Sequence, residues 1–354
     1  MLARWRLFVH RLAGHSYATA TDAVAGLLAV QAENPAQASW AVADRSVGVS
    51  DDSLAALLDQ GEILRTHVLR PTWHFVGADD IRWLVQLTAP RVRRTMVQVQ
   101  RSLGVDDAML DQSSDILATA LAGANHLVRD EAAAVLADAG LPVDAGRVGL
   151  FLTHAELSDL VCSGMTRDGE HTWALLDERA PHARRLDRDE ALAELTLRYF
   201  TGHGPATERD LAYWASLTLG DVRAGLATVA DELASFEHDG RTYWHAEVRP
   251  SDGAVAGPRA HVLQTLDELH NGYQDSRYAL DADRILPKGR LPSVGMVLVD
   301  GQFAAGHRRS VTDDRVTFEL DTYRSLPADE LDAIEDAAAR CGKFLGRPAL
   351  VITA

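Results

Sequence analysis

Cysteine is nearly absent from this chain: only Cys162 and Cys341 occur in 354 residues, and neither has a second cysteine or a histidine nearby at metal-ligand spacing. A disulfide framework and a zinc site are therefore not expected. Long apolar runs are also missing, since none approaches the roughly 18 residues that a membrane span requires. Arginines and a histidine interrupt the N-terminal stretch MLARWRLFVHRLAG, which favours an amphipathic helix of a cytoplasmic protein over a signal peptide.

Lysine is scarce among the charged residues: Lys288 and Lys343 leave 33 of the 35 basic side chains as arginine. Arginine suits planar, bidentate contacts with anions, although a GC-rich genome would produce the same bias. The net charge of −16 is unfavourable for nucleic-acid binding by the chain as a whole. Residues 81–105 nevertheless carry arginines and no acidic residue. We therefore expect one basic patch within an acidic protein.

Several catalytic motifs are missing too. The chain has no G-x-S-x-G elbow, P-loop, H-E-x-x-H or C-x-x-C, and GHGPAT lacks the third glycine and the preceding strand of a dinucleotide-binding fingerprint. The sequence therefore implies no nucleotide cofactor and no metal.

A supersecondary unit recurs along the chain. In residues 204–246, GPATERDLAYWASL and DVRAGLATVADEL predict two helices, with a start signal at Thr207 and a cap at Asp221, and HDG marks the turn of a hairpin. Helix, turn, helix and hairpin are the layout of a winged helix. A second copy runs from LVRDEAAAVLADAG to a hairpin at RDGE, and a less regular third copy covers the start of the chain.

The pattern changes near residue 260. GMVLVDGQFAAGH predicts a hairpin that turns at VDGQ, a helix follows near 327–342, and PALVITA predicts a final strand, while HNGYQDSRYALDADRILPKGRLP predicts a surface loop. We therefore predict an α+β fold of tandem winged-helix units followed by a β-rich C-terminal portion. The predicted parts are residues 1–122, 123–188, 189–258 and 259–354.

The stretch LLAVQAENPAQ ends an apolar run with Gln31 and Glu33. We predict a helix near 19–32 that breaks at Asn34, because the residue before a proline is pushed out of the helical region. Residues two apart on a helix point to nearly opposite sides, so only such a break lets the amide and the carboxylate share a site. Alternatively, both are solvated polar residues at a helix end.

Five stretches resemble, in order and spacing, the AlkZ and YcaQ group of winged-helix proteins: LLAVQAENP, LRPTWHFVGADDIRWL, GPATERDLAYWASL, HVLQTLDELHNGYQDSR and VGMVLVDGQFAAGHRR. The resemblance covers nearly the whole chain. Members with an assigned function are bacterial DNA glycosylases that excise alkylated bases and unhook interstrand crosslinks, and many others are known only as winged-helix DNA-binding proteins. It therefore implies tandem winged helices and, as an expected activity, DNA repair.

The catalytic signature of that group is a glutamine, one spacer, and then a glutamine or aspartate. Its matching positions here are Gln31 and Glu33, with Ala32 as spacer, so this chain departs from the pattern at the second position. A carboxylate there can stabilise the cationic sugar and accept a proton from water. The added methylene moves the charge by about 1 Å, which is enough to weaken catalysis or to change the substrate.

Other residues are candidates for DNA contact. Asn34 adjoins the signature, and RPTWHFVGADD places Trp73 and His74 on a strand whose alternation sends them to opposite faces, so one of them is expected in the core. Arginines after Pro90 and in GHRRS could bind phosphates, or they could be solvated surface. These arginines are Arg91, Arg93, Arg94, Arg101, Arg308 and Arg309.

The leading hypothesis is a cofactor-free glycosylase that hydrolyses the N-glycosidic bond of alkylated, including crosslinked, purines, with Glu33 activating water and Gln31 positioning it. We expect a cytoplasmic monomer that binds double-stranded DNA with alkylated bases and uses no membrane and no nucleotide cofactor. A non-catalytic, regulatory winged-helix DNA-binding protein is the alternative, and protein-interaction modules are a third reading that the net charge of −16 would suit.

Overall fold

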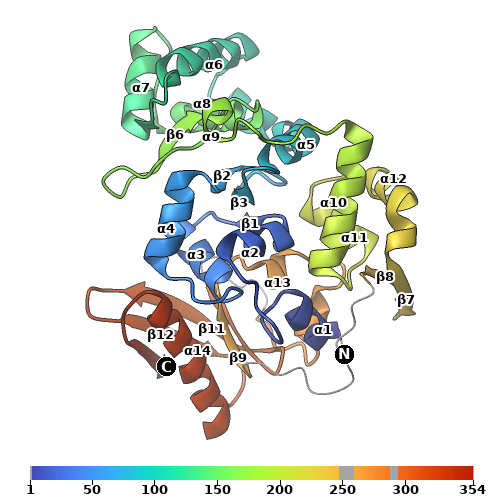
Figure 1. Ribbon diagram of the computed structural model, residues 1–354. Helices are drawn as coiled ribbons and strands as arrows, with labels where there is room; N and C mark the ends of the chain where they lie inside the picture. The colour runs from blue at the N-terminus through green and yellow to red at the C-terminus, as the bar shows by residue number, and fades with distance from the viewer. Residues whose placement is uncertain (1, 247–258, 288–293, 354) are drawn as a thin grey trace. The chain divides into compact units, whose positions relative to one another are not determined.

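The computed structural model describes residues 2–246, 259–287 and 294–353. The chain forms two compact units, each of which is described by itself (Figure 1). The larger unit comprises Met1–Leu54, Ala193–Trp214 and Thr218–Ala354, and the smaller unit comprises Ala55–Leu192 and Ala215–Leu217. The mixture of helices and strands confirms the predicted α+β class, whereas the predicted four-part division stays a prediction. Within these described ranges, no helix is both long and apolar enough to cross a membrane.

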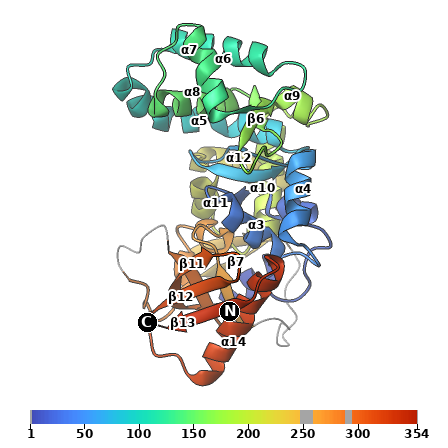
Figure 2. The same cartoon turned by 90° about the vertical axis from the view of Figure 1, so that its left-hand side faces the viewer.

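A five-stranded sheet with the order β13-β12-β11-β10-β9 organises the C-terminal part of the larger unit (Figure 2). Its strands are antiparallel except for the parallel pair β12 and β13. Helix α14 (Ala328–Phe344) packs on this sheet through Ile334 and Phe344, in a core that also contains Trp40. The strands are β9 (Ala260–Leu263), β10 (Gly295–Val299), β11 (Gln302–Val311), β12 (Val316–Thr322) and β13 (Ala349–Thr353).

The N-terminal segment of the larger unit corrects the predicted helix near 19–32. Helix α2 (Ala20–Leu27) ends early because Leu28 adopts a positive φ of 66°. The chain then forms a short strand, β1 (Val30–Gln31), so Gln31 does not lie on a helix. Asn34 and Pro35 begin helix α3 (Pro35–Ala43) rather than end one, with Asn34 as the N-cap and Pro35 in the first turn.

The expected order of elements is confirmed in residues 207–246: helix α11 (Glu208–Trp214), helix α12 (Leu219–Val229), and the hairpin of β7 (Ala234–His238) and β8 (Arg241–His245). Thr218, not Asp221, is the N-cap of α12, and Asp221 completes a capping box. The unit also contains α1 (Leu2–Val9), α13 (Glu268–Asn271), and the short 3-10 helices η1 (Ala230–Glu232) and η2 (Arg277–Leu280).

The predicted surface loop after residue 269 is wrong over its first half. Tyr273, Ser276 and Leu280 are almost fully buried. Asp210 anchors this segment, because its carboxylate accepts backbone N–H bonds from residues 274, 275 and 276 at 2.8–3.1 Å. Residues 288–292 of that prediction lie outside the described residues.

The smaller unit packs helices on short antiparallel strands, with a core that includes Leu117, Phe151 and Trp173. Its hairpin at RDGE is confirmed, since Asp168 and Gly169 turn with φ of 52° and 81°. Helices α4 (Asp51–Gln60) and α10 (Arg188–His203) each contain a boundary between the units. The smaller unit's elements are β2 (Ile63–His67), β3 (Trp73–Gly77), α5 (Ile81–Ser102), α6 (Asp107–Leu121), β4 (Leu127–Val128), α7 (Arg129–Asp138), α8 (Ala145–Leu157), β5 (Val161–Ser163), β6 (Thr172–Leu175) and α9 (Leu176–Arg179).

Candidate active site

Gln31 lies in the interior of the larger unit, with only 5% of its surface exposed. Its backbone N–H donates to the carboxylate of Glu268 at 2.9 Å, and its carbonyl accepts from Nε2 of Gln264 at 3.2 Å. Its side-chain Oε1 accepts from Nδ2 of Asn271 at 3.2 Å. One segment, residues 264–271, therefore holds both the backbone and the side chain of Gln31.

Glu268 is a buried carboxylate, 1% exposed, at the start of α13. Its Oε1 accepts from the Gln31 backbone and its Oε2 from Nε1 of Trp214 at 2.7 Å. Nε2 of His203 lies 3.7 Å from the same Oε2. Burial of a charge is unfavourable unless donors surround it, and here each carboxylate oxygen has an N–H donor.

A buried ion pair holds the N-terminal end of α13. Asp267, the N-cap of this helix, accepts the backbone N–H of Leu269 at 2.9 Å and contacts the Arg45 guanidinium at 2.6 and 3.1 Å. Both side chains of the pair are fully buried. Burial alone would lower the pKa of Arg45, but the attraction of Asp267 outweighs it and raises that pKa. The Arg45 guanidinium therefore stays charged, and its contact with Asp267 fixes the start of α13.

Next to this network lies a layer of neutral groups. Nε2 of His10 is 2.8 Å from the hydroxyl of Tyr273, which donates to the carbonyl of His203 at 2.6 Å. Because the hydroxyl has a single proton, His10 is the donor in the first of these bonds. Burial, assisted by His203 and Arg45, holds the pKa of His10 well below its usual value. This layer therefore adds no charge at neutral pH.

Glu33 differs from Gln31 in its surroundings. The Glu33 side chain is exposed, and the spacer Ala32 is fully buried. Asn34 is also exposed, and its Oδ1 accepts the backbone N–H of Gln37 at 3.1 Å to cap α3. The signature thus consists of a buried amide, fixed by neighbouring groups, and a carboxylate at the surface two residues later.

Trp73 and His74 lie in the smaller unit, on β3. As strand alternation predicts, they differ in exposure: His74 is fully buried, whereas Trp73 is half-buried. Nε2 of His74 lies 3.2 Å from the Arg70 guanidinium. Trp73 donates to Glu156 at 3.3 Å, and the Arg65 guanidinium lies 4.2 Å from its ring centre. These contacts place both residues in the packing of the smaller unit, and their contact with DNA stays a prediction.

The predicted DNA-binding arginines fall into two sets. Arg93, Arg94 and Arg101 are exposed on α5, with Arg91 half-buried beside them, and Arg93 donates to the carbonyl of residue 157 at 2.8 Å. The other set lies on β11 and consists of exposed Arg308 and half-buried Arg309. Their binding to phosphates also stays a prediction.

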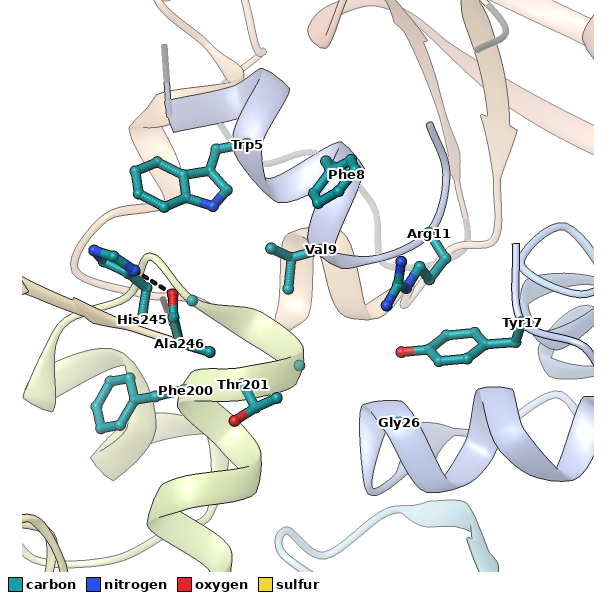
Figure 3. A pocket seen from close by; sticks show the side chains of 12 residues that line it. Trp5, Phe8, Val9, Arg11, Tyr17, Gly26, Phe200, Thr201, His245 and Ala246 are labelled. Atoms are coloured by element: carbon teal, nitrogen blue, oxygen red, sulfur yellow. Dashed lines mark hydrogen bonds between the residues drawn. The ribbon is translucent and has the colours of Figure 1, made fainter. Parts of the chain in front are cut away.

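The larger unit also contains a cavity of about 220 Å³ between α1, α2 and the end of α10 (Figure 3). Figure 3 shows aromatic side chains around it, among them Trp5, Phe8, Tyr17 and Phe200, together with Arg11. None of the described residues that line this cavity is acidic, and neither Gln31 nor Glu33 is among them. Among the described residues, this cavity therefore offers no carboxylate of the kind that the predicted hydrolytic site requires.

Sequence reasoning missed the residues that hold Gln31. These residues, Gln264, Asp267, Glu268 and Asn271, all occur in HVLQTLDELHNGYQDSR, a stretch that carries part of the family resemblance but contains no recognised catalytic motif. The available signal was a pair of consecutive carboxylates, Asp267 and Glu268, between Leu266 and Leu269. Buried acidic residues need nearby donors, but the sequence does not identify which donors these are.

Comparisons with known proteins concern the family and the fold of the chain. The family described as "DNA glycosylase AlkZ-like" matches residues 24–344 of the chain. A search of curated proteins finds no match. Among solved structures, the chain is similar to the Streptomyces sahachiroi DNA glycosylase AlkZ, with a TM-score of 0.78 and 21% identity over 100% of this chain and 98% of that one. This likeness supports the fold, and the family match, which spans most of the chain, shows that it belongs to the AlkZ-like DNA glycosylase family.

Proposed function

We propose that this protein hydrolyses the N-glycosidic bond of alkylated purines in duplex DNA, with Glu33 activating the water and Gln31 positioning it. Crosslinked purines belong to the same proposal, because they too are N-alkylated. The observation that supports it most is the network around Gln31, in which buried Glu268 and Gln264 hold the backbone and half-buried Asn271 holds the amide of a residue that matches the family's signature. A solvated helix end would need no such network.

The chemistry suits these two groups. As the bond between the base and C1′ lengthens, positive charge develops on the sugar, and an exposed carboxylate can stabilise it. Water attacks C1′, its proton passes to Glu33, and the bonding electrons leave with the base. An N7-alkylated guanine is already cationic and departs as a neutral molecule, so the reaction needs no strong general acid. The target nucleotide must first leave the base stack.

Glutamate at position 33 can replace the shorter aspartate because the side chain is exposed. In a buried site the extra methylene would force a rearrangement, since packed interiors tolerate little added volume. At an exposed position the longer side chain can change its rotamer to direct the carboxylate. We therefore propose that Glu33 supports turnover.

The test is base release from a duplex that contains one N7-methylguanine, measured in single turnovers with enzyme in excess. Wild type should release the base, and Glu33→Gln and Glu33→Ala should lower the rate by at least about 100-fold, which is the scale for loss of an acid–base group. Glu335→Gln removes an exposed carboxylate on α14 and serves as the matched control. Absence of release by wild type, or equal rates for wild type and Glu33→Ala, would refute the mechanism.

The exposure of Glu33 is also what a non-catalytic DNA-binding protein would have, so this alternative keeps a specific observation in its favour. The same assay separates the two functions when it is combined with fluorescence anisotropy on the same duplex. Tight binding without base release supports the alternative. Release that depends on Glu33 supports the enzyme.

A further inference from the structure

The one-turn helix α13 presents two side chains to a single residue. Glu268 and Asn271 are three apart, so they lie on the same helix face. Glu268 accepts the backbone N–H of Gln31, and Asn271 donates to its side-chain Oε1. A contact that only held α13 against β1 would need just one of these two hydrogen bonds. The two together fix both the position and the rotation of the Gln31 amide.

The bond from Asn271 determines the polarity of that amide. Nδ2 of asparagine can only donate, so the atom it contacts at 3.2 Å is the carbonyl oxygen of Gln31. The Nε2H₂ group of Gln31 is therefore the end directed away from Asn271. We propose that Glu268 and Asn271 are positioning residues that make Gln31 a hydrogen-bond donor to the attacking water. This inference rests on the function proposed above.

A donor at Gln31 complements a carboxylate at Glu33. The attacking water must keep one lone pair for C1′, so its other lone pair can accept a hydrogen bond while Glu33 takes a proton. Gln31 supplies that hydrogen bond without adding charge. If the amide were reversed, its oxygen could accept the water's second proton, but no group would then donate a hydrogen bond to the water's second lone pair.

Position 268 requires a carboxylate in particular. Its two oxygens face two N–H donors, those of Gln31 and Trp214, at 2.9 and 2.7 Å. A glutamine of the same shape has one oxygen and one NH₂ group, so it would place a donor against a donor in either orientation. Glu268→Gln should therefore displace Gln31 or Trp214, whereas removal of the Trp214 N–H would make the glutamine acceptable.

Variants of Asn271 test the polarity. Alanine removes the bond to the Gln31 Oε1 and should lower the single-turnover rate on the N7-methylguanine duplex by about tenfold, as expected for one hydrogen bond. Aspartate can only accept, so Asn271→Asp should reverse the Gln31 amide and lower the rate by about 100-fold, the scale for a lost catalytic donor. Gln274→Glu adds a carboxylate at an exposed position three residues later and controls for the charge. An Asn271→Asp rate equal to or above that of Asn271→Ala would overturn the donor assignment.

A second set of variants tests Glu268. Glu268→Gln should lower the rate by about 10- to 100-fold with little change in the dissociation constant for DNA, and adding Trp214→Phe should restore most of it. In a Gln31→Ala background, Glu268→Gln should have little further effect, because residues that act through each other are not additive. Equal losses in both backgrounds, or no rescue by Trp214→Phe, would assign Glu268 to folding alone.

These outcomes are distinguishable from failure of the proposed function. If wild type releases no base, the proposed function fails and this inference fails with it. If wild type releases base in a Glu33-dependent way and the Asn271 and Glu268 variants match wild type, the function stands and only the positioning role is wrong. Should Glu268→Gln not fold, the half-buried Asn271 series still decides the donor assignment.

Discussion

Removal of one charge from the buried pair of Arg45 and Asp267 should destabilise the larger unit strongly. The variant is Asp267→Asn, because asparagine is also a good N-cap and can keep the bond to the backbone N–H of Leu269. The change therefore isolates the loss of charge from the loss of the cap. Both side chains are fully inaccessible to solvent, and the guanidinium contacts the carboxylate with two nitrogens, at 2.6 and 3.1 Å.

The size of the effect follows from this burial. Removal of one partner from a buried ion pair leaves an uncompensated charge, and the free energy of unfolding falls by about 3–5 kcal/mol. For a unit of about 200 residues, 1 kcal/mol corresponds to about 2–4 °C. The Tm of Asp267→Asn should therefore lie about 6–20 °C below that of wild type, and base release should fall because α13 positions Gln31.

Differential scanning calorimetry at pH 7 measures this effect. The matched control is Glu208→Gln, which breaks an exposed ion pair in the same unit, between Nε of Arg223 and the Glu208 carboxylate at 2.8 Å. This change should alter the free energy of unfolding by no more than about 1 kcal/mol. Substitution of both buried partners by apolar residues, Arg45→Met with Asp267→Leu, should recover part of the loss, because no charge then stays unpaired. A Tm for Asp267→Asn equal to that of Glu208→Gln would refute the reasoning.

Two further predictions concern pH and glycine. Burial, followed by the charge of Arg65, lowers the pKa of His171 to about 4. Between pH 4 and pH 6.5 the unfolded chain binds one more proton at His171 than the folded chain does. The free energy of unfolding should therefore be highest above pH 6.5, and it should fall by up to about 3 kcal/mol on acidification to pH 4. Urea unfolding across this window should show a smaller slope for His171→Phe, and an unchanged slope would contradict the assignment. Gly202→Ala should lower the Tm because its Cβ would lie 2.2 Å from the backbone oxygen of Gly26. Gly220→Ala is the control: its Cβ would meet only the Thr218 side-chain oxygen, at 3.5 Å, so its Tm should equal or exceed that of wild type.

Elements with local signals could be predicted from the sequence. The hairpins at HDG and VDGQ are confirmed because their Asp-Gly pairs adopt positive φ at both positions, 48° and 68° at Asp239 and Gly240, and 51° and 77° at Asp300 and Gly301. This conformation is what a two-residue hairpin turn requires, and Asp-Gly is among the pairs that adopt it most readily. Such turns depend on a few neighbouring residues, so no tertiary information is needed to find them.

The end of α2 could not be predicted in the same way. The residues from Leu27 to Val30 are all fully buried, so their apolar pattern has no exposed face from which helical periodicity could be recognised. The helix stops at Leu28, a leucine with a φ of 66°, which no turn signal announces. Tertiary packing, not local preference, holds this conformation. The same pattern made Asn34 and Pro35 look like a helix end when they begin the next helix.

The support of Gln31 lies further beyond sequence reasoning, because Gln31 and Glu268 are 237 positions apart. From the sequence alone, Glu268 is predicted to lie at the surface, because most glutamates in folded proteins are exposed. Only the fold brings it to the N–H groups that make its burial favourable. A sequence can therefore indicate candidate residues for the chemistry, but the network that holds Gln31 is visible only once distant segments meet.

The two positions of the signature should consequently respond differently to substitution. Gln31 is held at its backbone N–H, its carbonyl and its side-chain oxygen, so a substitution there removes the bond to Asn271 and acts on a segment that Glu268 and Gln264 also hold. Glu33 is exposed, and a change there alters the carboxylate of the proposed mechanism while the bonds of Gln31 to residues 264, 268 and 271 stay in place. Variation at the second position is thus the structurally easier route to a new substrate or rate. Glutamate in place of the family's glutamine or aspartate is a change of this kind, and Glu33→Asp, which shortens the side chain by one methylene, should fold like wild type while changing the rate of base release.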